Sequence, residues 1–456
     1  MGSVVCWKGV CSVAREALGD YLTAVGAQIH WRRARKSLLR ELTDHIADQA
    51  ADYQAQGLEE KTALERAVAE MGDPEEVGRA LDRLHRPQNR WMIALIALLM
   101  AIAGVFFQFL AYETTGPGMI ELYPRQLLWV PLSFALLCAV WFSDCTLLLR
   151  RWWAVGLMAA ATLWAVFSTN GTYRPAALYG ALLLPVLYAA LLCRLRSRGS
   201  LAVFLCGLAA WLLPLPALLV PSLSAYLLSG SVMLLTLSAA VGLGWFAGTR
   251  WKQLLLVWGP LLFGLGALFL CLLHGSFFTA RMAYFLHPEQ HLDGGGYFYF
   301  HLRRGLDPVF WDNVLNSTDL MLAFLAWRAG RWIFLLAAAL LALAALLLLL
   351  RVGRLHSRSG KLLALSALLP LLLQGGLYLL FDLGYSPLAP LSLPFLSYGG
   401  SYLMVNSLLA GVLLSVFRMD TLLRDTLTDP APHPFPSRLV LSLRKGKLLI
   451  EYPKAP

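Results

Sequence analysis

The sequence predicts an all-α, polytopic membrane protein with about ten transmembrane helices, preceded by a small soluble domain of three helices. The 456-residue chain is 58% apolar and only 14% charged, and its mean hydropathy is +0.62, unlike a soluble globular chain. Residues 1–90 are nearly neutral, with 13 Lys/Arg against 14 Asp/Glu. The remaining residues are basic, with 25 Lys/Arg against 13 Asp/Glu. This contrast predicts a soluble segment followed by a membrane segment.

Ten apolar runs follow residue 90, and most are long enough to cross a hydrocarbon core of about 30 Å as a helix. Their expected spans are 91–112, 126–147, 152–169, 175–193, 201–219, 222–247, 253–273, 319–350, 362–384 and 398–417. The third run is the shortest candidate. The eighth is unusually long, so a tilted helix is expected there.

Basic residues mark every second connection between these runs. They are Arg150, Arg151, Arg194, Arg196, Arg198, Arg250, Lys252, the 351–361 stretch and Arg418. Because Lys and Arg in short loops resist translocation, this alternation places both termini in the cytoplasm. It predicts a multi-pass protein of the cytoplasmic membrane with one long outer loop, residues 274–318.

Residues 1–90 are predicted to form a cytoplasmic helical domain. Apolar residues recur at helical spacing between 12 and 86, and Gly57 and Gly72 stand where helices should end. Asp73 is the expected N-cap of a last helix that begins with Pro74. The pattern "RELTDHIADQAADYQAQGLEEKTALERAVAEMGDPEEVGRAL" resembles the permease-prefix helical domain of bacterial membrane proteins.

Near the C-terminus, "LSLPFLSYGGSYL" (391–403) interrupts the apolar pattern with prolines and a Gly-Gly pair. Irregular backbone at membrane depth is tolerated only where protein or a cavity surrounds it. We therefore expect a loop or re-entrant segment that leads into the last helix at the outer face. There Gly399 and Gly400 allow a backbone path or a close approach that side chains would block.

The stretch "PLSLPFLSYGGSYLMVNSLLAGVLLSVFR" closely resembles the C-terminal signature of the SEDS family, the RodA/FtsW/SpoVE type of shape, elongation, division and sporulation proteins. "YPRQLLW", with Arg125 and Gln126, is similar to the start of the family's second helix. The resemblance covers a ten-helix membrane domain at 91–418, which leaves 419–456 as a cytoplasmic tail. It implies a glycosyltransferase that polymerises lipid II into peptidoglycan glycan strands with a class B penicillin-binding protein, for cell shape, division or sporulation.

The outer loop resembles the family's catalytic loop, in which "STDLMLAF" places Asp319 at the position of the catalytic acid. A carboxylate in the first turn of a membrane helix could take the proton from the attacking sugar hydroxyl. Cationic side chains would hold the pyrophosphate leaving group, and the C-terminal signature would line the outer substrate cavity. The expected substrate-binding residues are Arg281, Tyr297, Arg303, Arg304, Ser397, Tyr398, Gly399, Gly400 and Ser401. On its residues alone, a helix cap behind Thr318 is the favoured interpretation of Asp319.

Several departures from the family pattern predict a divergent member. His291 stands where the family has an aspartate, about a dozen residues of the loop's middle are missing, and Trp327 and Arg328 replace two glutamates. Because intramembrane charges are usually functional, these losses leave a second class of function open. In that alternative the chain is a non-catalytic SEDS-like scaffold, or a protein that binds or transports lipid II.

No cofactor or metal site is predicted. His287, His291 and His301 fit no compact ligand motif, and nothing indicates a divalent cation, although the chemistry would allow one. The tail "RLVLSLRKGKLLIEYP" alternates like a β-hairpin. Its basic residues favour contact with membrane lipid over nucleic acid.

Overall fold

The computed structural model divides the chain into two compact units, one built mainly from residues 1–89 and the other mainly from residues 90–417. It describes residues 12–85, 91–115, 122–145, 179–219, 222–259, 266, 276–304, 320, 322–323, 326, 330, 332–389, 391–420, 440–444 and 447–451. The structural statements below concern these residues.

The N-terminal unit contains four helices, one more than expected. They are α1 (Ser12–Gln28), α2 (Arg32–Ala55), α3 (Glu60–Glu70) and α4 (Pro74–His85). Gly57 and Gly72 follow α2 and α3 with φ of +97° and +84°, which confirms them as helix stops. The missed break lies at residues 29–31, where neither a glycine nor a proline interrupts the pattern.

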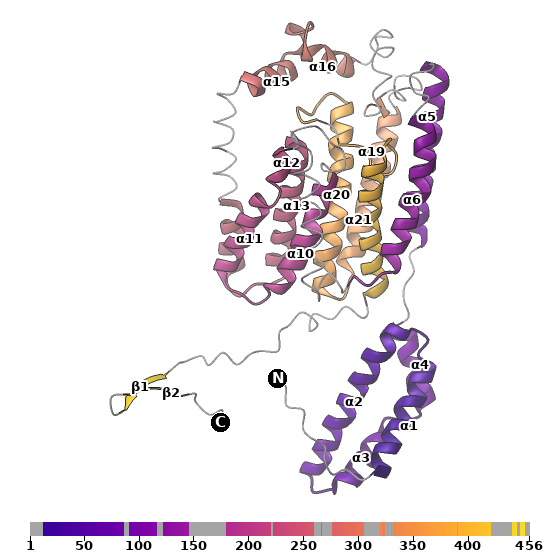
Figure 1. Ribbon diagram of the computed structural model, residues 1–456, viewed down its shortest axis with the longest axis vertical. Coiled ribbons are helices and arrows are strands. Elements are labelled where there is room, and N and C mark those ends of the chain that lie inside the picture. Colours follow the sequence, from indigo (N-terminus) through magenta and orange to yellow (C-terminus); the bar gives the residue numbers. More distant parts are fainter. Residues whose placement is uncertain are drawn as a thin grey trace. The chain divides into compact units, whose positions relative to one another are not determined.

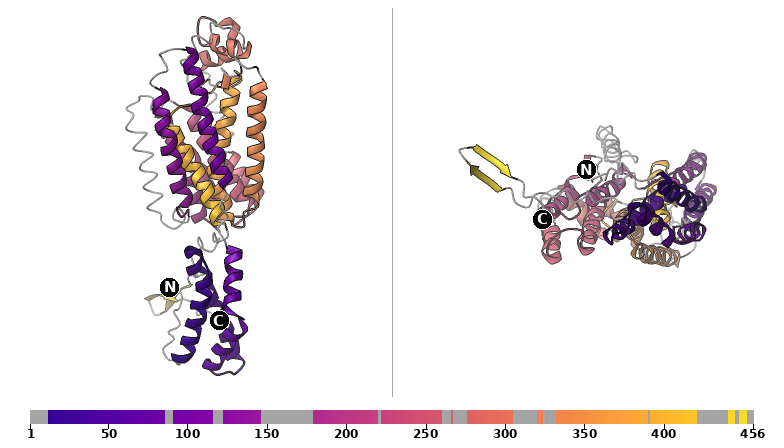
Figure 2. Two further views of the ribbon diagram at one scale, coloured as in Figure 1. Left: turned by 90° about the vertical axis from the view of Figure 1, so that its right-hand side faces the viewer. Right: turned by 90° about the horizontal axis from the view of Figure 1, so that it is seen from below.

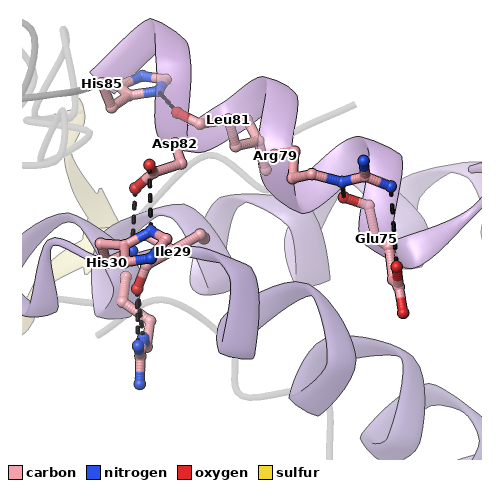
Figure 3. A network of polar contacts seen from close by, with 8 residues as sticks. Ile29, His30, Glu75, Arg79, Leu81, Asp82 and His85 are labelled. Atoms are coloured by element: carbon pink, nitrogen blue, oxygen red, sulfur yellow. Dashed lines mark hydrogen bonds and ion pairs between the residues drawn. The ribbon is translucent and has the colours of Figure 1, made fainter.

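A small apolar core and a polar network hold the four helices together. Val25, Ile29 and Ile46 are fully or almost fully buried in the core. Figure 3 shows the Asp82 carboxylate of α4 facing His30. One carboxylate oxygen accepts the His30 backbone N–H at 2.9 Å, and the other lies 3.3 Å from the ring nitrogen Nδ1. These contacts tie the end of α1 to α4.

Asp73 caps α4 as expected. Its carboxylate accepts the Glu76 backbone N–H at 3.1 Å, and α4 begins at Pro74. Glu75 and Glu76 occupy the first turn and Arg83 and His85 the last, which complements the helix dipole.

Glu70 joins α3 to α2, and loss of the hydrogen bond that Tyr53 donates to it should change how acid affects this unit. The Tyr53 hydroxyl donates to Glu70, which lowers the pKa of the Glu70 carboxyl and raises the pKa of Tyr53. A carboxyl with a lowered pKa stabilises the fold above its ordinary pKa, and this contribution disappears as pH falls through the lowered value. We expect hydrogen-exchange protection of the α2–α3 amides to fall with acid in the wild type, and to depend less on pH in Tyr53→Phe. An equal pH dependence in both proteins would contradict this role.

The second unit is an all-α membrane unit. Its elements are α5 (Trp91–Thr115), α6 (Leu122–Phe142), η2 (Ala181–Leu183), α10 (Leu184–Arg194), α11 (Ser200–Leu212), α12 (Pro216–Leu219), α13 (Leu223–Gly242), α15 (Ser276–Leu286), η3 (Pro288–Gln290), α16 (Gly295–Arg304), α19 (Trp332–Gly353), α20 (Arg358–Asp382) and α21 (Gly400–Met419). Within the described residues, five helices are long and apolar enough to cross a membrane, and three shorter apolar helices accompany them.

Eight of the ten expected spans overlap described helices over much of their length. Of the other two, the span 152–169 lies outside the described residues. The span 253–273 overlaps a helix described at 250–259. The count of ten therefore stays a prediction.

The eighth span is not one long helix. Gly330 adopts φ of +107° and its N–H bonds to the Ala326 carbonyl at 2.9 Å, which ends a short helical segment. Helix α19 then begins at Trp332. The expectation of one tilted helix over 319–350 was wrong, because a glycine at a left-handed position between Arg328 and Arg331 ends the first helical segment.

The membrane helices run side by side in both side views, and α15 and α16 lie across one end of them (Figures 1 and 2). Helix α20 packs against α10, α13 and α19. Helix α19 is at the periphery, since none of its membrane window is buried, whereas 78% of the α21 window is buried. The α20–α21 pair and the segment between them therefore lie in the interior of the unit.

The C-terminal tail contains the expected hairpin. Strands β1 (Val440–Arg444) and β2 (Lys447–Glu451) pair in antiparallel register, with Val440 opposite Glu451.

Candidate functional site

The segment between α20 and α21, residues 383–399, is irregular, and we call it the signature segment. Gly384, Phe395 and Gly399 adopt φ of +77°, +64° and +134°. Left-handed residues and the prolines at 387 and 394 exclude a continuous helix. The chain therefore needs other partners for the backbone groups that a helix would have satisfied.

Polar side chains from neighbouring helices supply these partners. The Gln374 amide of α20 donates to the Ser392 carbonyl at 2.5 Å, and the Ser392 N–H donates to the Tyr179 hydroxyl at 3.1 Å. The Ser224 hydroxyl of α13 donates to the Ala389 carbonyl at 2.7 Å. Because an unsatisfied amide is costly at membrane depth, these contacts allow irregular backbone inside the unit.

Gln126 links the start of α6 to the Gly-Gly pair. Its side chain is fully buried, and its Oε1 accepts the Gly399 N–H at 3.2 Å. A Cβ on Gly400 would lie 2.8 Å from Cγ of Trp129 and closer still to the fused carbons of that ring. The two stretches that resemble the family separately, "YPRQLLW" and "SYGGS", are thus in direct contact.

The three hydroxyl residues of the signature have different environments. Ser397 is buried, and its oxygen accepts the Leu393 N–H at 2.8 Å, so it shapes a turn within the segment. Tyr398 and Ser401 are half-buried. The hydroxyls of Tyr398 and Ser401 are therefore the better placed of the three to meet a ligand.

Arg281 and Arg303 fasten helices α15 and α16 to the signature segment. Nε of Arg281 on α15 donates to the Pro387 carbonyl at 2.7 Å, and Nε of Arg303 on α16 donates to the Gly384 carbonyl at 3.0 Å. Nη2 of Arg303 also donates to the Phe285 carbonyl at 2.7 Å. Two of the expected pyrophosphate ligands are therefore also structural links between α15, α16 and the end of α20.

Tyr297 and Arg304 also lie on α16, at its two ends. The Tyr297 ring is half-buried and 4.3 Å from the His301 ring, centroid to centroid. The exposed Arg304 guanidinium lies 4.2 Å from the centroid of the Phe300 ring.

Asp319, the expected base, lies outside the described residues, but the residue after it has a defined place. Leu320 is buried with Leu302 of α16 and Phe381 of α20. Leu322 is buried with Tyr378 of α20 and Leu393 of the signature segment. The structure therefore brings the turn after Asp319 together with α16, α20 and the signature segment.

Asp382 is a charged residue of this region that the sequence reasoning missed. It is the last residue of α20, only 1% exposed, and its Oδ2 accepts the Ala323 N–H at 3.0 Å. It is the one acidic residue within the apolar run 362–384, and this isolation could have singled it out.

His287 and His291 have separate partners. Nδ1 of His287 lies 3.8 Å from Glu289, whereas His291 packs edge-on against Tyr284. Among the residues that the structure describes, no three His, Cys, Asp or Glu side chains are grouped to hold a metal ion.

Two family models match the chain. Residues 20–80 match the HAAS model, which differs from the permease-prefix domain named above, and residues 314–421 match the FtsW/RodA/SpoVE model described as "Cell cycle protein". No curated protein matches the chain. The second match spans Asp319, α20, the signature segment and α21. This part of the chain is therefore similar to the FtsW/RodA/SpoVE family of cell-cycle proteins, the family that the C-terminal motif resembles.

Proposed function

We propose that the protein is a glycosyltransferase that polymerises lipid II into glycan strands at the outer face of the cytoplasmic membrane. One observation carries this proposal. The family match at 314–421 includes both Asp319 and the signature segment, and the residues that follow Asp319 are buried against α20 and Leu393 of that segment. A base, a set of cations and a cavity wall could therefore act at one place.

Asp319 would be the general base. It would take the proton from the C4 hydroxyl of one sugar as the oxygen bonds to the anomeric carbon of another. The bond from that carbon to the lipid pyrophosphate breaks, and the pyrophosphate leaves with the electron pair. This role would account for a carboxylate directly before Leu320, which is buried against α16 and α20.

Arg281 and Arg303 would assist the leaving group while they hold the loop. A guanidinium has five N–H donors, and the bonds to backbone carbonyls described above engage one donor of Arg281 and two of Arg303. The remaining donors suit pyrophosphate oxygens, as does the exposed Arg304. Tyr297, Tyr398 and Ser401 are the proposed contacts to the sugars.

The second candidate is a non-catalytic scaffold or lipid II carrier. The structural use of Arg281 and Arg303 favours it, because these contacts are needed for the fold whether or not chemistry takes place. A class B penicillin-binding protein and membrane lipid are the proposed partners in both cases. Incubation of the purified chain and that partner with labelled lipid II separates the two functions, because only the enzyme yields muramidase-sensitive polymer.

The enzyme also requires α15 and α16 to face outward, with both chain termini in the cytoplasm. Gln290 and Arg354 are exposed on opposite sides of this proposed topology. A cysteine introduced at Gln290 should react with an impermeant thiol reagent in intact cells, and one at Arg354 only after the membrane is opened. The reverse pattern would invert the topology and exclude an outer active site in this loop.

A further inference from the structure

We propose that Asp382 is a positioning residue that fixes the helical turn directly after Asp319. The inference rests on the proposed function, in which Asp319 is the base. It assigns to α20 a part in the chemistry that neither the family matches nor the motif comparison indicates.

The location of Asp382 is the first reason. Helix α20 is one of the five helices able to cross the membrane, and Asp382 ends it with only 1% of its surface exposed. An ionisable side chain in such a place is costly to desolvate, so it persists where it has a specific partner and a role.

The partner is the second reason. The Asp382 carboxylate accepts the Ala323 N–H at 3.0 Å, and the Tyr378 hydroxyl accepts the Leu322 N–H at 3.3 Å. Residues four apart lie on one face of a helix, so α20 presents both acceptors to the same turn. The first N–H groups of a helix have no partner within it, and a carboxylate there is also favoured by the helix dipole. Helix α20 thus supplies hydrogen-bond acceptors to the N–H groups of Leu322 and Ala323.

The consequence concerns Asp319, which immediately precedes Leu320 in the chain. Any shift of the 320–323 turn against α20 would also change where the preceding residue lies relative to Arg303, because Arg303 is bound to the Gly384 carbonyl two residues beyond Asp382. A misplacement of about 1 Å can cost a large factor in rate. Asp382 therefore acts on the chemistry through the position of Asp319.

The test compares hydrogen exchange of the 320–326 amides in the purified full chain. Asp382→Leu removes the acceptor, so exchange there should rise about tenfold or more, the size expected for a lost charge-assisted hydrogen bond. Asp382→Asn keeps an acceptor oxygen and should change exchange by less than about threefold. Gln374→Leu is the matched control, because it removes another buried polar group of α20 that bonds to Ser392 instead.

Lipid II polymerisation, measured beside exchange, separates this proposal from the proposed function. We expect Asp382→Leu to lose activity in parallel with protection, and Asp382→Asn to retain most of both. Local loss of protection in Asp382→Leu supports the positioning role of Asp382 even if the wild type polymerises nothing. A wild type that polymerises nothing would contradict only the proposed enzymatic function. Unchanged exchange in Asp382→Leu overturns the proposal. An Asp382→Asn protein with normal exchange but no polymerisation also overturns it, because the activity would then depend on the charge of Asp382 and not on its hydrogen bond.

Discussion

Gly400→Val is expected to abolish function while the chain still inserts into the membrane. A side chain at this position would overlap the Trp129 ring of α6, so α21 or α6 would have to move. Gln126 of α6 also accepts the Gly399 N–H, and therefore the displacement would break the contact that holds the signature segment. Overpacking a well-filled interior typically costs about 1–3 kcal/mol, and here the strain falls on the proposed cavity wall.

Gly376→Val is the matched control for this variant. Gly376 lies inside α20, and an added Cβ would meet no atom within 4 Å. Membrane abundance of both variants and their ability to support growth in place of the wild type would be measured together. Full function of Gly400→Val would show that the Gly-Gly pair only begins a helix, and would remove the signature segment from the active site.

Asp319→Asn should lower lipid II polymerisation by about 10² or more, the usual contribution of a general base. The amide keeps the size of the side chain and an oxygen that can cap the helix, but it cannot accept the proton. Membrane abundance should therefore stay at the wild-type level. Asp319→Ala is less informative, because it removes the base and the cap together.

Asp293→Asn and Asp312→Asn are the controls for this change. Both residues lie between 274 and 318, in the stretch expected to form the outer loop, and Asp293 is exposed just before α16. Their variants should keep most of the activity. Equal losses in all three variants would indicate a general requirement for negative charge in the loop and would argue against Asp319 as the base.

Composition and basic-loop spacing predicted the fold class, because hydrophobic length and charge are local properties of the chain. Helix ends at glycines were also predictable in the N-terminal unit, where Gly57 and Gly72 end helices as expected. The break at Gly330 was missed although Arg328 and Arg331 flank the glycine, because the apolar residues on either side were interpreted as one span. The break at 29–31 was missed because no residue there demands a turn.

The candidate site was predictable only as a set of motifs. Sequence could show that residues 391–403 are irregular, but not that Gln126 binds Gly399 from 273 positions away in the chain. Nor could it show that Arg303 bonds to the Gly384 carbonyl, because long-range contacts depend on the packing of whole helices. The hydrogen bond from the Ala323 N–H to Asp382 could not be predicted from the sequence for the same reason.

The most direct test of the central claim is the polymerisation of lipid II by the purified full chain with its class B penicillin-binding protein, whose transpeptidase is blocked. Products would be resolved by length and digested with muramidase. The account predicts muramidase-sensitive glycan strands from the wild type and about 100-fold less from Asp319→Asn. No polymer from the intact pair, or equal polymer from both proteins, would contradict it.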